Sequence, residues 1–154
     1  MRAKQDWDTR LIQMLHNCEA GEKSVITVYA RPYEVLDPAD GAEVRLFEGP
    51  PLAMVLHEWR DDGMPAWRGR PIDQNSERIT RPYETALASG NFAFSWGKLL
   101  EECGHSAEYD NVFSWEEIWM AYKYWSAGYT LYAPNETVMH HNWDRTYRPV
   151  FKDE

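Results

Sequence analysis

Residues 90–96 read GNFAFSW, residues 113–134 read FSWEEIWMAYKYWSAGYTLYAP, and residues 140–145 read HHNWDR. This order predicts a strand that ends in a loop, then a helix headed by two adjacent carboxylates, then strands that lead to a histidine pair. Strand and helix patterns also alternate in the rest of the chain. The sequence therefore predicts an α/β fold in which helices pack on a mixed sheet.

The composition is that of one globular domain with an acidic balance. At 154 residues the chain can bury a substantial core but has little room for two domains. Its formal charge of −9 and the absence of a Lys/Arg cluster disfavour a nucleic-acid partner. A diphosphate remains compatible, because a bound divalent cation can invert the local charge. The 8 Trp and 9 Tyr residues suit both core packing and stacking on sugar rings.

Targeting signals and cysteines point to one cellular environment. The first ten residues contain no apolar segment of a signal peptide, and no run approaches the roughly 20 apolar residues of a membrane span. Neither Cys18 nor Cys103 lies in a CxxC pair, so a zinc ribbon or redox motif has no support. The two cysteines allow either one disulfide or two free thiols, and free cytosolic thiols are the expectation. We therefore expect a cytoplasmic protein that has no membrane partner.

Periodicity places the secondary structure. Apolar spacing predicts a helix over residues 6–18, capped by Asp6 or Asp8, and further helical segments over 98–103 and 114–126. Residues 60–83 carry several Pro and Gly residues, so we expect an exposed connection there with one short strand near Pro71–Ile72. A short helix or turn is expected over Tyr83–Ala88. Strands are expected at residues 24–30, 52–59, 91–96, 129–133 and 137–141.

The acidic pair at the head of the third helix has two interpretations. Ser114 and Glu117 form the pattern of a capping box, in which the side chains satisfy free backbone amides. A helix start that opens onto a cleft could instead offer the carboxylates to ligand hydroxyls. Both are compatible if Glu117 caps the helix and Glu116 faces a ligand. The stripe Ile118, Ala121, Tyr122 and Trp125 predicts the buried face of this helix.

The histidine pair can supply one side chain to a given site. Adjacent strand residues point to opposite faces, so only one of His140 and His141 reaches the same side of the sheet. No HxD or HxxxH pattern elsewhere completes a metal site, and Asp61-Asp62 lies in an expected turn. A metal site made by this sequence alone is therefore not expected.

Together these motifs resemble the GlcNAc-transferase-like family of GT-A glycosyltransferases, which includes enzymes that act on hydroxyproline of a protein. The family's WD-x-x-LI helix, small-residue segment, F-x-GEE helix, HGY-x-L-x-x-P strand and H-x-W-x-R ending are matched in order. The corresponding residues are Trp7-Asp8 with Leu11-Ile12, Ala88-Ser89-Gly90, Phe113 to Glu117, Ala127 to Pro134, and His141, Trp143 and Arg145.

The resemblance implies transfer of a sugar, typically GlcNAc from UDP-GlcNAc, to a protein or glycan acceptor with retention. It implies that Glu116 and Glu117 are the catalytic candidates, which position the sugar or the acceptor hydroxyl. Gly90, Asn91, Trp115 and Trp143 are the expected substrate-binding residues, and Trp115 stands where the family has glycine. His141, or alternatively His140, would ligate a Mn²⁺ or Mg²⁺ ion bound to the diphosphate.

The resemblance also predicts an incomplete glycosyltransferase domain over residues 1–154, corresponding to the C-terminal part of a GT-A fold. The family's nucleotide-binding βα units and DxD motif precede the WD helix, so the cation is expected only with a DxD-bearing segment. We expect little turnover from these residues alone, and an exposed sheet edge that pairs with a second copy or a complementing chain. The alternatives are a non-catalytic glycan- or protein-binding module and a small self-associating structural protein.

Overall fold

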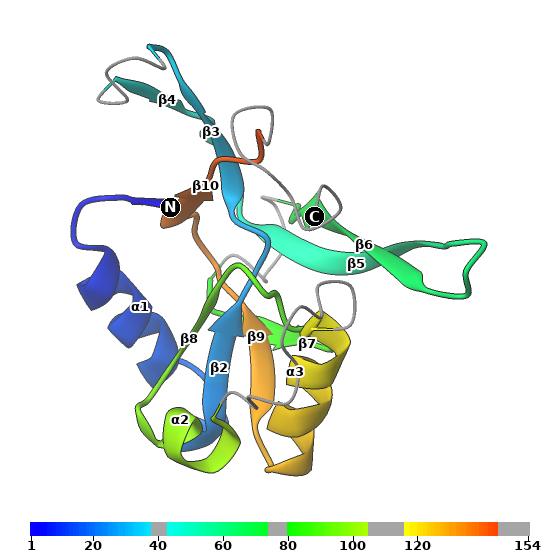
Figure 1. Ribbon diagram of the computed structural model, residues 1–154. Helices are drawn as coiled ribbons and strands as arrows, with labels where there is room; N and C mark the ends of the chain where they lie inside the picture. The colour runs from blue at the N-terminus through cyan, green and yellow to red at the C-terminus, as the bar shows by residue number, and fades with distance from the viewer. Residues whose placement is uncertain (38–42, 74–79, 105–115, 145–154) are drawn as a thin grey trace.

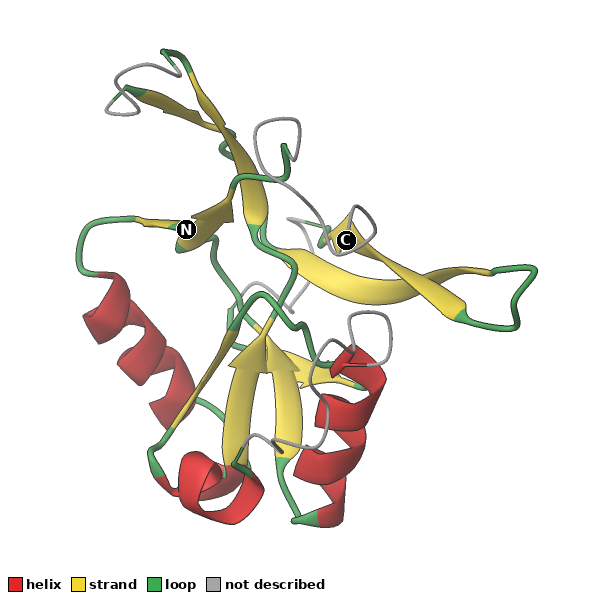
Figure 2. Cartoon of the chain, in the orientation of Figure 1, coloured by secondary structure: helices red, strands yellow, loops and turns green. Residues whose placement is uncertain are grey.

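A computed structural model describes residues 1–37, 43–73, 80–104 and 116–144. Over these ranges the fold is mixed α/β, with three helices and a 3-10 turn around two four-stranded sheets and a separate hairpin (Figures 1 and 2). The elements are β1 Arg2–Ala3, α1 Trp7–His16, η1 Gly21–Lys23, β2 Ser24–Thr27, β3 Arg31–Val35, β4 Val44–Leu46, β5 Leu52–Trp59, β6 Pro65–Pro71, β7 Tyr83–Thr85, β8 Ala93–Ser95, α2 Lys98–Cys103, α3 Glu116–Ser126, β9 Thr130–Ala133 and β10 Met139–His141.

The core sheet has the strand order β7-β9-β2-β8, with β2 and β9 parallel at its centre. All four residues of β2 are buried, as expected of a central strand covered on both faces. Two apolar clusters lie against this sheet. One joins α1 to β2 through Leu11, Leu15 and Ile26, and the other joins α2 and α3 to β9 through Leu99, Ala121 and Leu131.

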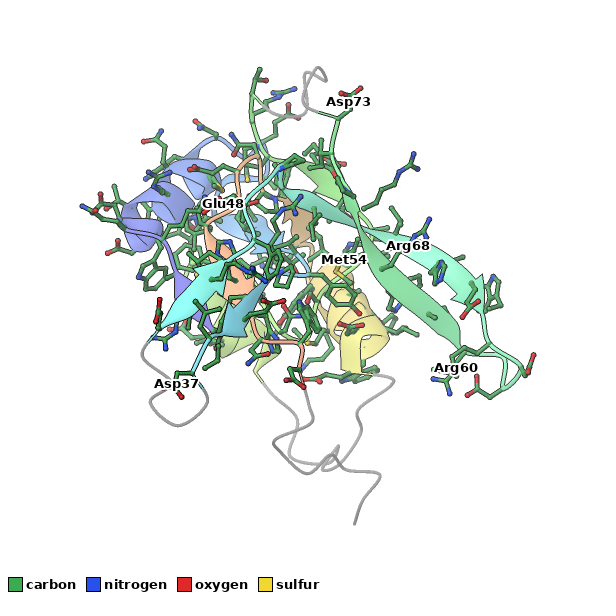
Figure 3. All side chains as sticks on the ribbon, turned by 90° about the horizontal axis from the view of Figure 1, so that it is seen from above. Asp37, Glu48, Met54, Arg60, Arg68 and Asp73 are labelled. Carbon is green, nitrogen blue, oxygen red and sulfur yellow. The ribbon has the colours of Figure 1, made fainter. Side chains whose placement is uncertain are left out.

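The second sheet has the strand order β1-β10-β3-β4. It lies above the carboxyl ends of β2 and β9 in the view of Figure 1. β10 pairs in parallel with β3, so His140 lies opposite Arg31 and His141 opposite Pro32. The β5–β6 hairpin pairs only with itself among the described residues. It reaches outward from the body, with Arg60 at its outer end (Figure 3).

Most expected elements are confirmed, including α1, β2, β5, β8, α2, β9 and β10. The thiols of Cys18 and Cys103 are free and buried, as expected. Asp6 does not cap α1 with its side chain; it adopts a left-handed backbone conformation with φ 56°. The expected helix or turn at Tyr83–Ala88 is wrong, because Tyr83–Thr85 forms β7 against β9.

The connection expected over residues 60–83 is also wrong in part. Residues 65–71 form β6, seven residues long and paired with β5 from Trp59–Pro65 to Leu52–Pro71. Pro65 and Pro71 obscured this strand in the sequence. They are tolerated because they are its first and last residues and because a two-stranded ribbon leaves one edge unpaired.

The buried face of α3 differs from the expected stripe. Ala121 is buried as expected, but Tyr122 and Trp125 are 60% and 52% exposed. The second buried residue is Tyr124, at 7% exposure. Because residues 118–125 are apolar or aromatic on nearly every side, their periodicity could not select the face that packs on the sheet. Trp119, Tyr122 and Trp125 consequently form an exposed aromatic face. None of the described helices is long and apolar enough to cross a membrane.

His140 makes the stability of the fold depend on pH. Its side chain is 0% exposed, and burial lowers its pKa although Glu48 lies nearby. Below about pH 6.5, the ordinary histidine pKa, the unfolded chain takes up a proton that folded His140 resists. We therefore expect the urea midpoint to fall between pH 7.5 and pH 5.5.

The control for this titration is exposed His57, on β5. The variant H57Q should retain the pH dependence of the urea midpoint, whereas H140Q should lose a large part of it. Equal slopes in H140Q and the unchanged chain would contradict the role given to His140.

Candidate functional site

An open cleft of about 710 Å³ lies where the chain leaving the carboxyl end of β2 meets the start of α3. Ligand sites of α/β folds commonly form at this edge of a parallel strand pair. The loop that contains Gly90, together with β10, completes one wall. The β5–β6 hairpin forms the facing wall. Six of the expected site residues line this single cleft, namely Gly90, Asn91, Glu116, Glu117, His141 and Trp143.

The two carboxylates at the start of α3 have different surroundings. Glu117 accepts a hydrogen bond from the Tyr29 hydroxyl at 2.6 Å and another from the Gly90 amide at 3.1 Å. Glu116 has no hydrogen bond or ion pair with any described residue, and it lines the cleft. Ser114, and with it the expected capping box, lies outside the described residues. Glu117 is therefore occupied by the protein, while Glu116 is available to a ligand.

Burial and hydrogen bonding set the protonation of this corner. Burial raises the pKa of Glu117 above its usual value, and the bonds from Tyr29 and Gly90 oppose that shift. The neighbouring charge of Glu116 raises it further. Burial and contact with Glu117 raise the pKa of Tyr29 as well, so its hydroxyl stays protonated and donates. The start of α3 therefore presents two carboxylates, of which Glu117 is hydrogen-bonded to the protonated hydroxyl of Tyr29.

The loop between Ala88 and Phe92 is bonded to β2. The hydroxyl of buried Thr27 accepts from the Ser89 amide at 2.8 Å and donates to the Phe92 carbonyl at 2.9 Å. The side-chain oxygen of Asn91 accepts from the Ala30 amide at 3.5 Å. Together these bonds fix the backbone that carries Gly90 and Asn91. The bonds give both residues a defined position beside the cleft. Their role in substrate binding stays a prediction.

Gly90 is the point at which the loop meets the helix. A Cβ atom at this position would lie 3.2 Å from Oε2 of Glu116 and 3.6 Å from Cγ of Glu117. The first distance is tight and the second is an ordinary contact, so a side chain at residue 90 would require the Glu116 carboxylate to shift by a few tenths of an ångström. The absence of a side chain at residue 90 allows the loop and both carboxylates to approach one another.

Aromatic rings form much of the remaining wall. The Trp143 ring packs against His141 at 4.5 Å between centroids and against the edge of Tyr29 at 5.6 Å. Its indole Nε1–H donates to the Ala30 carbonyl at 3.1 Å. Trp143 is thus held in place by the protein and offers one ring surface to the cleft. Trp115, the other expected tryptophan, lies outside the described residues.

The hairpin contributes residues that the sequence did not suggest. Trp67 lines the cleft and is half-buried, and its indole N–H has no partner within the described ranges. Leu52 and Gly69 also line it, on the same face of the ribbon as Trp67 according to the strand register. Arg60 reaches it from the turn but pairs with Asp62 at 2.7 Å.

A metal ion does not fit the residues that the structure describes. No group of three His, Cys, Asp or Glu side chains among them is placed to hold one. His141 packs on Trp143, and both oxygens of Glu117 are engaged. His140 points away from the cleft and is 0% exposed, so the alternation expected for the pair is confirmed. His141 as a ligand stays a prediction, and no chemical step follows from it here.

Tyr29 and Trp67 escaped the sequence analysis for different reasons. Tyr29 is the second residue after β2, and the end of a buried parallel strand is a known signal for a site residue. Trp67 had no such signal, because Pro65 and Pro71 led the sequence analysis to predict a loop where β6 forms. The turn sequence Asp61-Asp62-Gly63, followed by further alternation, was the available clue for a hairpin.

Comparison with known proteins gives one match. The family model described as Glycosyltransferase (GlcNAc) matches residues 1–154. No curated protein and no solved structure matches this chain. The match covers the whole length analysed, including the carboxylate pair, the Gly90 loop and the hairpin. The chain therefore belongs to the GlcNAc glycosyltransferase family.

Proposed function

We propose that this chain binds the sugar of a nucleotide sugar in the cleft between Glu116 and Trp67 and takes part in its transfer to an acceptor. Membership of the family implies a sugar donor and an acceptor. The observation that supports this location is the free Glu116 carboxylate, which faces a cleft with aromatic walls. UDP-GlcNAc is the proposed donor, and a protein or glycan the proposed acceptor. The GT-A fold is part of the same proposal.

The chemistry of the two walls suits a sugar ring. A pyranose has a polar rim of hydroxyls and an apolar face of C–H groups, so it pairs with a carboxylate at its edge and a flat ring against its face. Glu116 supplies the carboxylate, which accepts charge-assisted hydrogen bonds from hydroxyls. Trp67 supplies the flat ring, and its free indole N–H can donate to a hydroxyl.

The divalent cation of the proposed reaction would be bound mainly by a separate DxD-bearing segment. A divalent ion held by such a segment would supply positive charge beside the diphosphate of the donor. His141 is the residue of this cleft suited to complete its ligands, and the remaining carboxylates would come from a DxD-bearing segment. The division into a nucleotide-binding part and the part described here stays a prediction.

The test is calorimetric titration of UDP-GlcNAc, first in EDTA and then with Mn²⁺. In EDTA the unchanged chain should show a saturable heat, because Glu116 and Trp67 need no metal. The variant E116Q retains a neutral acceptor but loses charge assistance worth about 1 kcal/mol, so it should bind about fivefold more weakly. Absence of saturable heat under both conditions, or equal affinity of E116Q, would contradict the proposed site.

Release of UDP separates a transferase from a non-catalytic glycan-binding module. With Mn²⁺ present, a transferase slowly releases UDP when water replaces the acceptor, and E116Q should release it more slowly. UDP release that is slower in E116Q than in the unchanged chain would exclude a non-catalytic binding module.

A further inference from the structure

Glu116 and Glu117 have different contacts, which indicates different roles for the two carboxylates. Both oxygens of Glu117 are engaged within the protein, Oε2 by the Tyr29 hydroxyl and Oε1 by the Gly90 amide. A carboxylate has about four acceptor sites, so these two bonds use half of the capacity of Glu117 and fix its orientation. Glu116 lies one residue earlier on the same helix, beside the same glycine, and has neither bond.

We propose that Glu117 is a positioning residue, which joins Tyr29 to Gly90 and thereby holds Glu116 as the carboxylate that contacts the sugar. This inference rests on the proposed function for its ligand, but the clamp of Tyr29, Glu117 and Gly90 is a property of the folded chain. The nearness of the two glutamates would otherwise suggest equivalent roles.

Gly90 connects the clamp to Glu116. The bond from its amide to Glu117 fixes the loop against the start of α3. Gly90 has no Cβ atom, and one placed there would lie 3.2 Å from Oε2 of Glu116. The glycine therefore leaves room for this carboxylate beside the loop. If the bond to Glu117 is lost, the loop stays attached to β2 through Thr27, but the start of α3 is no longer tied to Gly90. The distance between Gly90 and the Glu116 carboxylate is then no longer held. Glu117 therefore acts on the ligand through Gly90.

Glutamine at residue 117 can reproduce the clamp, and this allows a sharp test. Its amide oxygen can accept from the Gly90 N–H, while its NH₂ group donates to the Tyr29 oxygen, which switches from donor to acceptor. Alanine can make neither bond. A positioning role therefore predicts that glutamine rescues what alanine loses. A direct role of the Glu117 charge predicts that both variants fail alike.

The first measurement is UDP-GlcNAc affinity by calorimetry for E117Q and E117A, with the E116Q variant as reference. We expect E117Q within about threefold of the unchanged chain and E117A at least about fivefold weaker, a loss comparable to one hydrogen bond to a charged group. Affinity of E117Q as low as that of E117A would overturn the positioning role.

The second measurement needs no ligand. The Gly90 amide resonance should shift with pH as Glu117 titrates, with a midpoint above the usual glutamate pKa. Y29F removes a bond that lowers this pKa, so the midpoint should rise. E116Q removes a like charge, so the midpoint should fall. In E117Q the titration should disappear. His141 also lines the cleft, and the H141Q variant is the control for a contribution of that ring to the shift.

The two measurements distinguish the two claims. A Gly90 resonance that does not follow Glu117 would overturn the clamp, whatever the chain binds. If the resonance behaves as expected but the unchanged chain binds no UDP-GlcNAc, the clamp stands and the proposed function fails.

Discussion

Replacement of Leu131 by alanine is expected to lower the free energy of unfolding by about 3 kcal/mol, the usual range for a leucine deleted from a packed core being 2–5 kcal/mol. Leu131 is 0% exposed on β9, opposite Val25 of the parallel strand β2. It belongs to the cluster that joins the core sheet to α2 and α3. Its loss would weaken the attachment of α3 and thus the support of both carboxylates.

Urea unfolding measures this change, with the variant L100A as its control. Leu100 is 69% exposed on α2, so the same truncation there should cost less than about 0.5 kcal/mol. A loss below about 1 kcal/mol in L131A would mean that the cluster is not packed as described.

Replacement of Trp67 by alanine is expected to weaken UDP-GlcNAc binding by about tenfold, because it removes both an apolar surface and an N–H donor from the hairpin wall. The affinity of W67F should lie between those of W67A and the unchanged chain, since phenylalanine keeps a flat ring but lacks the N–H donor. The hairpin itself should persist, because its strands pair along seven residue positions.

Trp59 provides the matched control for Trp67. It lies on the same hairpin, is 67% exposed and does not line the cleft. W59A should therefore bind UDP-GlcNAc as the unchanged chain does. Calorimetry on the three variants measures the effect, and a W67A affinity equal to that of W59A would remove the hairpin from the site.

Much of the fold could be predicted from sequence because several elements have one strong local signal. β2 has a run of β-branched residues, and α1 has a single apolar face. β6 failed because its prolines suppress the strand signal and only the pairing with β5 overrides them. The face of α3 failed because nearly all of its sides are apolar, so only the tertiary structure decides which one is buried.

The site was predictable to a similar extent. The sequence identified residues on three elements that now line one cleft, including Gly90, Glu116 and His141. It could not assign partners to them, because the bonds of Glu117 join segments 88 and 27 residues apart. The facing wall was missed entirely, since the hairpin that carries Trp67 was not expected.

The most direct test of the account is where UDP-GlcNAc contacts the chain. In a spectrum of the eight tryptophan indole N–H groups, assigned by single Trp→Phe variants, the Trp67 signal should shift progressively on titration. Trp119 and Trp125, on the exposed aromatic face of α3, should not respond. Shifts at Trp119 and Trp125 with none at Trp67 would contradict a sugar site in the cleft.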